Sequence, residues 1–306
     1  MKAPLPLVHR LSMVALFVLS CLGVDRGLSF MCKSIVDHSH NRFSGLYQGG
    51  MPQQILVLGN SRGVMLVYPP DFKKVVSAPV FNLSYNGLNI QIMEAFLDDY
   101  LDFNEAPLGI LIELSGLNAK DNAVLHELKP FATYSERLQL LFKKHCPTSL
   151  RAMRLFNLYS YNCESFLRSL YFFDRSKNDQ TDWCVRDSIN PEFLKNYTLD
   201  PRACETLRPV CEENLAALGR ILATCKARNI PVALIVAPYL PHYIERLQEP
   251  FEQWLRQVQA YVGDSYPIHD YSGAIFDISC FQDNLHMNVA GSRKLLEQLL
   301  ANGTIA

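Results

Sequence analysis

The sequence predicts an α/β fold, with a parallel sheet covered by helices on both faces. Short, almost wholly apolar runs recur along the chain, as expected for strands that are buried on both sides. These runs alternate with longer segments of helical periodicity, a pattern typical of βαβ units. The composition is that of a globular protein, because 49% of the 306 residues are hydrophobic and 19% are charged.

Five apolar runs are the expected strands, and four longer segments are the expected core helices. The strands are Ile55–Leu58, Pro79–Leu83, Leu108–Leu114, Pro231–Ala237 and Tyr266–Asp270. The helices are Leu88–Phe103, Ala203–Arg228, a segment that ends near Val262, and Val289–Ala301. The Leu88–Phe103 segment places Ile92, Ala95, Phe96 and Tyr100 on one face, which favours a helix that packs on the sheet.

The N-terminus is a separate element. Lys2, His9 and Arg10 precede an uncharged apolar run, Leu11–Val24, and a basic flank before such a run is typical of an export signal. The run is shorter than the roughly 20 residues that a membrane span needs. Extending it to Cys32 places Asp25 and Arg26 inside, where they could pair with each other or lie near the membrane interface.

Three interpretations of this segment remain open: an uncleaved signal-anchor, which we favour, a cleaved signal peptide, and a lipoprotein signal acylated at Cys21. All three export the rest of the chain. We therefore expect residues 1–32 to form the anchor or signal, residues 33–50 a linker, and residues 51–306 an extracytoplasmic domain.

Residues 120–200 interrupt the strand–helix alternation and form the expected insertion. Leu138–Lys144 and Leu150–Phe173 have helical character, and Asp174–Asp187 is polar and loop-like. Because long insertions at strand ends commonly shape binding sites, we expect this one to form a wall over the site. Its aromatic residues could stack on sugar rings or simply pack helices together: Phe156, Tyr159, Tyr161, Phe166, Tyr171, Phe172 and Phe173.

The nine cysteines fit an exported chain without requiring one, and they could be free buried thiols or disulfides. The absence of any C-x-x-C spacing argues against structural zinc. Asp37-His38-Ser39-His40 is expected to face solvent rather than to bind a metal. The net charge of −1 gives no indication of a nucleic-acid partner.

Ser61 directly follows the first strand, in the stretch Gly59-Asn60-Ser61. Ligands of open α/β sheets bind at the carboxyl ends of strands, so this serine is a candidate nucleophile. A hydroxyl nucleophile needs an adjacent base that a third group orients. Asp283 and His286, three residues apart near the C-terminus, can supply the orienting carboxylate and the base.

These two blocks resemble those of the SGNH (GDSL-like) hydrolase superfamily, which has a Gly-x-Ser after its first strand and an Asp-x-x-His near its C-terminus. Two intermediate blocks resemble the family in the same order. Phe81–Gly87 looks like the block that contributes a glycine amide, and Leu111–Asn118 looks like the one that contributes an asparagine amide. The chain departs from the family at Asn60, where many relatives have Asp, and at Ala119, where Asp often follows the asparagine.

The resemblance implies a three-layer α/β/α flavodoxin-like sandwich of the SGNH-hydrolase type, with a helical insertion. It implies catalysis by Ser61, His286 and Asp283, with an oxyanion hole formed by Ser61, Gly87 and Asn118, and without a metal or cofactor. Arg62, Asn86 and His242 are expected to contact substrate, although His242 could instead cap the helix that follows it.

The layout is similar to the anchored bacterial branch of the superfamily, whose members move acyl groups on cell-wall polymers or exopolysaccharides. This implies a membrane-tethered serine esterase or O-acyltransferase that acts on acyl esters of a cell-surface glycan or polymer. The alternative is a non-catalytic binding or assembly component of a polysaccharide-modification system, with the same fold and a misaligned triad.

Overall fold

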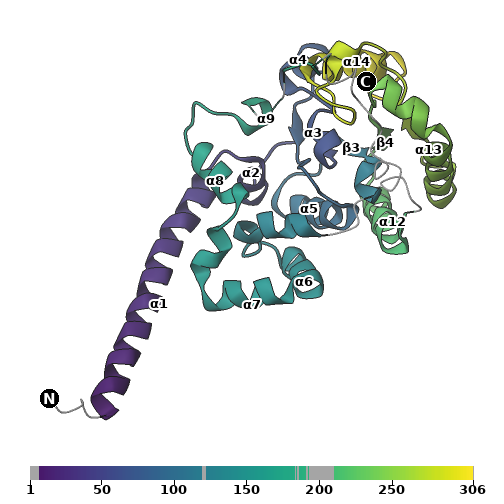
Figure 1. Cartoon of the computed structure of the whole chain (residues 1–306). Helices are drawn as coiled ribbons and strands as arrows, with labels where there is room; N and C mark the ends of the chain where they lie inside the picture. The colour runs from purple at the N-terminus through teal and green to yellow at the C-terminus, as the bar shows by residue number, and fades with distance from the viewer. Residues whose placement is uncertain are drawn as a thin grey trace. The chain divides into compact units, whose positions relative to one another are not determined.

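The computed structural model describes residues 7–118, 122–182, 184, 186–190, 192 and 210–305. It divides into two compact units (Figure 1). The helical unit consists of Met1–Ser44 with Leu125–Lys177, and the sheet unit consists of Gly45–Val124 with Asn178–Ala306. The candidate nucleophile, base and acid all belong to the sheet unit.

The sheet unit is organised around five parallel strands in the order β2-β1-β3-β4-β5. These strands are β1 (Ile55–Leu58), β2 (Val80–Asn82), β3 (Gly109–Glu113), β4 (Val232–Val236) and β5 (Ile268–Asp270). Leu56, Val57 and Leu58 of β1 are completely buried, as the continuous apolar run predicts. The strand order places β1 between β2 and β3, so β1 is an inner strand with a neighbour on each side.

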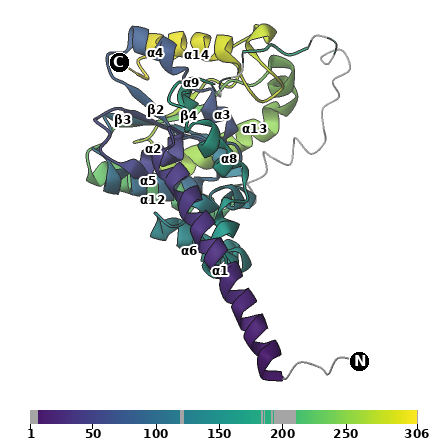
Figure 2. The same ribbon diagram turned by 90° about the vertical axis from the view of Figure 1, so that its left-hand side faces the viewer.

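Helices cover both faces of this sheet, which confirms the predicted three-layer α/β architecture. In both views, α5 and α12 lie on one side of the strands and α4 and α14 on the other (Figures 1 and 2). Their bounds are α4 (Pro69–Val75), α5 (Ile90–Phe103), α12 (Glu212–Ala227) and α14 (Val289–Ala301). The long helix α13 (Pro241–Val262) follows β4, and the short helices α3 (Ser61–Val64) and α9 (Asp179–Asp182) lie in connections.

Side-chain caps fix the starts of the helices that border the site. Asn89 begins α5 by accepting a hydrogen bond from Ile92 N (3.0 Å), and Asn288 begins α14 by accepting one from Gly291 N (3.1 Å). The expected start of one helix at Ala203 lies outside the described residues. Within the described part, α12 begins at Glu212.

The helical unit is built on α1 (Leu7–His38), a single helix of 32 residues. It also contains η3 (Lys129–Phe131), α6 (Glu136–His145), α7 (Pro147–Leu155), η4 (Asn157–Tyr161) and α8 (Glu164–Tyr171). The C-terminal half of α1 packs against η4 and α8, whereas the N-terminal half of α1 extends beyond the other helices of the unit (Figure 2). Asp25 fixes the point where packing begins, since its carboxylate accepts hydrogen bonds from Asn157 N (2.9 Å) and Leu158 N (3.0 Å).

This arrangement corrects the expected linker at residues 33–50. α1 continues to His38, and α2 (Arg42–Gln48) fills most of the remainder. Lys33 and Asp37, one helical turn apart, form an ion pair of 2.8 Å that favours continuation of the helix. Much of the expected insertion therefore folds with the N-terminal helix rather than with the sheet.

Four of the aromatic residues of the insertion form two ring pairs. Tyr161 meets Phe166 edge-on with ring centroids 5.3 Å apart, and Tyr171 meets Phe172 in the same way at 5.0 Å. These two pairs fit the helix-packing alternative, whereas Phe156 and Phe173 are exposed. The eight cysteines that the structure describes are free thiols, which is the free-thiol alternative for those residues.

Candidate active site

Ser61 is the first residue of α3, immediately beyond the carboxyl end of β1. Asn60 caps this short helix, because its side-chain oxygen accepts a hydrogen bond from Arg62 N (3.0 Å). The turn is tight. A Cβ atom added to Gly59 would lie 2.8 Å from the Cα of Gly63, so glycine is required for this close approach. The backbone thereby holds the serine at the sheet edge.

His286 and Asp283 lie on a loop that is closed on itself between η5 (Ile278–Cys280) and α14. Phe281 and Met287 form an antiparallel bridge, and Gln282 N donates a hydrogen bond to the carbonyl of His286 (3.0 Å). The Asp283 carboxylate accepts hydrogen bonds from the backbone N–H groups of Leu285 (2.8 Å) and His286 (2.9 Å). The Asp283 side chain is therefore held by the backbone of its own loop.

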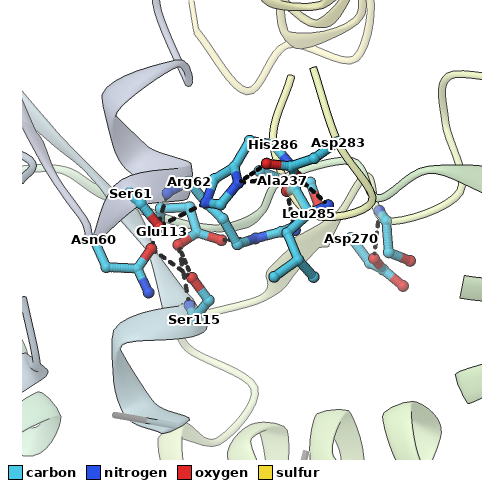
Figure 3. A network of polar contacts seen from close by, with 11 residues as sticks. Asn60, Ser61, Arg62, Glu113, Ser115, Ala237, Asp270, Asp283, Leu285 and His286 are labelled. Carbon is cyan, nitrogen blue, oxygen red and sulfur yellow. Dashed lines mark hydrogen bonds and ion pairs between the residues drawn. The ribbon is translucent and has the colours of Figure 1, made fainter. Parts of the chain in front are cut away.

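The three predicted residues form one continuous chain of hydrogen bonds (Figure 3). His286 Nε2 lies 2.8 Å from Ser61 Oγ, and His286 Nδ1 lies 2.9 Å and 3.0 Å from the two carboxylate oxygens of Asp283. Burial by itself would raise the pKa of Asp283, but hydrogen bonds from His286 and the loop backbone hold that pKa below its ordinary value. We therefore assign the ring proton to Nδ1, which leaves Nε2 to accept the serine proton.

A cavity of about 460 Å³ opens beside this chain. Polar and apolar side chains both line it, and the described lining residues include no Phe, Tyr or Trp: Ser61, Val64, Met65, Asn86, Asp182, Gln282, Asp283 and His286. The insertion contributes Asp182 of α9. Gln180 of the same helix holds α9 at the sheet edge, because its side chain accepts from Asn82 N (2.8 Å) and donates to Asn82 O (3.3 Å).

Two of the candidate oxyanion donors, the backbone N–H groups of Ser61 and Gly87, are free to bind a ligand. Within the described part of the chain, neither Ser61 N nor Gly87 N donates a hydrogen bond. Gly87 has φ = +76°, a left-handed conformation that favours glycine. Asn118 ends the 3₁₀ helix η1 (Leu114–Asn118), and its side-chain oxygen is buried without a partner among the described residues. Asn86 lines the cavity as expected, whereas Gly87 and Asn118 are not among the lining residues.

The position of Arg62 corrects the expectation that it contacts substrate. Its side chain is only 5% exposed and does not line the cavity. Nε donates to the carboxylate of Glu113 (3.2 Å), Nη1 donates to the carbonyl of Leu285 (2.7 Å), and Nη2 donates to the carbonyl of Ala237. The guanidinium also stacks on Tyr239, with Cζ 3.4 Å from the ring centroid.

Arg62 thus joins the Ser61 turn to the ends of β3 and β4 and to the loop that carries Asp283 and His286 (Figure 3). Glu113 is completely buried and also accepts a hydrogen bond from Ser115 N (3.1 Å). The sequence contained a signal for this pair, because a carboxylate at the end of an apolar strand needs a buried partner.

His242 also differs from the expected substrate contact. It lies in the first turn of α13 with its side chain 65% exposed, and its nearest charged neighbour is Glu245 at 3.9 Å. It is not among the residues that line the cavity. The alternative role as a helix cap is not observed, since Leu240 occupies the cap position of α13.

No family model and no curated protein sequence matches the chain. Among solved structures, it is similar to a Streptococcus pneumoniae protein provisionally named a platelet activating factor. The two share 13% identity and a TM-score of 0.43, over 95% of this chain and 98% of that one. It is also similar to a GDSL-like lipase from Bacteroides thetaiotaomicron, with 9% identity, a TM-score of 0.37, and coverage of 83% of this chain and 89% of that one. The SGNH-like interpretation of the site rests on its own residues and geometry.

Proposed function

We propose that the chain is a serine-dependent esterase or O-acyltransferase in which Ser61 attacks an acyl ester. The observation that carries this proposal is the chain of hydrogen bonds from Ser61 through His286 to Asp283, at the wall of an open cavity. An aligned triad of this kind favours an enzyme over a non-catalytic component with misaligned residues.

In the proposed mechanism, His286 Nε2 takes the proton of Ser61 as Oγ bonds to the acyl carbon. The same nitrogen then returns the proton to the departing alcohol, which leaves an acyl group on Ser61. The N–H groups of Ser61 and Gly87 are available to donate to the oxyanion, with Asn118 as the third candidate donor. In comparable sites, loss of one such donor raises the barrier by about 3–4 kcal/mol.

A second nucleophile, either water or a sugar hydroxyl, completes the reaction. The amides of Asn86 and Gln282 and the carboxylate of Asp182 suit a substrate with many hydroxyl groups. We therefore propose an acylated glycan of the cell surface as the substrate class. The segment Leu11–His38 of α1 is long and apolar enough to serve as a membrane anchor, which would retain the enzyme close to such a polymer.

The test is turnover of a short-chain aryl ester by the purified full-length chain. Ser61→Ala and His286→Ala should each abolish turnover while preserving the far-UV circular dichroism of the wild type. Wild-type turnover by purified Ser61→Ala would overturn the assignment.

The acceptor is tested by adding oligosaccharides to the acyl-enzyme. A transferase passes the acyl group to a sugar far more often than the molar ratio of sugar to water predicts. Removal of Asp174–Asp187, which contains α9, should then shift the product toward hydrolysis with little effect on acylation. If the acyl-enzyme is hydrolysed rapidly and transfers its acyl group to none of the glycans tested, the protein is an esterase and not a transferase.

A further inference from the structure

The helical unit contains a second cavity, of about 370 Å³, that includes none of the triad residues. One face of α1 forms a wall through Arg26, Ser29, Phe30 and Lys33, whose spacing places them on a single stripe of the helix. Arg154 of α7 contributes to the opposite side. The charged side chains that line this cavity are all basic.

The cavity begins where the apolar part of α1 ends. Leu16, Phe17 and Val24 are 67%, 68% and 59% exposed, whereas Asp25 is only 7% exposed and starts the packed half of the helix. If the apolar stretch lies in a bilayer, Arg26 is within two residues of its last apolar position. Its guanidinium would then be at the depth of the lipid head groups, where arginine side chains are stable.

The cations of this cavity are only partly neutralised. Arg26 pairs with Asp25 (2.6 Å), and Lys33 pairs with Asp37 (2.8 Å). Arg154 forms no ion pair with any residue that the structure describes. Arg154 therefore leaves the cavity with a positive charge that no described carboxylate offsets.

Exposed apolar side chains surround the same cations. Leu155 and Phe156, which directly follow Arg154, are 63% and 55% exposed, and Phe30 on α1 is 75% exposed. Cationic groups next to exposed apolar groups complement a ligand that carries an anion beside hydrocarbon chains. A free inorganic anion would contact the cationic groups but would leave the apolar side chains exposed.

We propose that this cavity binds the phosphate-bearing head group of an anionic glycerophospholipid, with the acyl chains along the apolar surface of α1. The bound lipid would fix the helical unit at the membrane surface. This proposal requires α1 to lie in a membrane, but it does not depend on esterase activity.

The test uses the full-length chain in a neutral detergent and measures lipid binding by native mass spectrometry. Phosphatidylglycerol and phosphatidylcholine with identical acyl chains are compared, together with inorganic phosphate alone. Arg154→Gln and the double variant Arg26→Gln/Arg154→Gln are the test proteins. Arg151→Gln is the matched control, because Arg151 is exposed on the same helix and does not line the cavity.

Phosphatidylglycerol should bind more tightly than phosphatidylcholine to the wild type. Its affinity should fall about fivefold in Arg154→Gln and about thirtyfold in the double variant, with little change in Arg151→Gln. Thermal unfolding of each variant confirms that the helical unit is intact. Equal binding of the two lipids, equal losses in the Arg151→Gln control, or inorganic phosphate binding as tightly as the lipid would each overturn the proposal.

Discussion

The buried guanidinium of Arg62 should hold the catalytic loop in place, and Arg62→Met tests this directly. Methionine preserves much of the volume but removes the charge and every side-chain hydrogen bond. Arg62 donates to Glu113 and to the carbonyls of Leu285 and Ala237, and such charge-assisted bonds contribute about 1.5–3 kcal/mol each. The variant also leaves the carboxylate of Glu113 buried without its cation.

Loss of one partner from a buried ion pair costs about 3–5 kcal/mol, and we expect a destabilisation in this range for Arg62→Met. Leu285 precedes His286, so release of its carbonyl should also shift the imidazole. A displacement of about 1 Å can lower the rate about a hundredfold. We therefore expect kcat for an aryl ester to fall about a hundredfold with little change in KM, because Arg62 does not line the cavity.

The assay combines urea unfolding, followed by tryptophan fluorescence, with steady-state kinetics. Glu113→Gln and the double variant complete a thermodynamic cycle, in which the double variant should be less destabilised than the sum of the single variants. Arg220→Met is the control, since Arg220 is 58% exposed in its ion pair with Glu94 and should contribute at most about 1 kcal/mol. A loss below about 1 kcal/mol in Arg62→Met with normal kcat, or strict additivity in the cycle, would refute the reasoning.

Three further predictions concern the triad, the cavity and the location of the chain. Asp283→Asn should lower kcat by about 10⁴-fold by disturbing the imidazole tautomer, as a pH-rate profile and kinetics would show. The pKa of Asp283 is lowered in the folded state, so its ionised carboxylate stabilises the fold. The wild type should therefore have a higher free energy of unfolding than Asp283→Asn above about pH 4, and this difference should disappear as the pH falls further. Asp182→Asn should raise kcat/KM for an anionic acyl ester up to about fivefold relative to a neutral one, whereas Asp174→Asn, which is exposed outside the cavity, should not. A reporter fused after Ala306 should be active only on the outer side of the cytoplasmic membrane, and a soluble cytosolic product with an intact N-terminus would contradict the anchor.

The sheet could be predicted from the sequence because its information is local. A buried parallel strand is encoded by a short apolar run, and Ile55–Leu58 forms β1 with the predicted bounds. The grouping of Ser61 with Asp283 and His286 could be predicted because a hydroxyl nucleophile needs a base and an orienting carboxylate, and because the blocks that carry them resemble those of a known family. In the structure, Ser61 Oγ and His286 Nε2 lie 2.8 Å apart although 225 positions separate them in the chain.

The errors arose where a residue depends on distant partners. Arg62 was expected to contact substrate, but its partner Glu113 lies 51 positions away and becomes its neighbour only through the pairing of β1 with β3. The packing of α1 is non-local in the same way. Asp25 interrupts the apolar run. Its hydrogen-bond donors are the backbone N–H groups of Asn157 and Leu158, which lie in η4, within the insertion. A linker was expected at residues 33–50, whereas α1 continues to His38 because it packs against residues that are distant in the sequence.

Covalent labelling by a fluorophosphonate probe tests the central claim most directly. The probe phosphonylates a serine only where a neighbouring base and an oxyanion hole activate it, so it needs no knowledge of the natural substrate. We predict one adduct per chain, located on the peptide that contains Ser61, and a large loss of labelling in His286→Ala. An unlabelled wild-type protein, or an adduct that persists in Ser61→Ala, would contradict the proposed nucleophile.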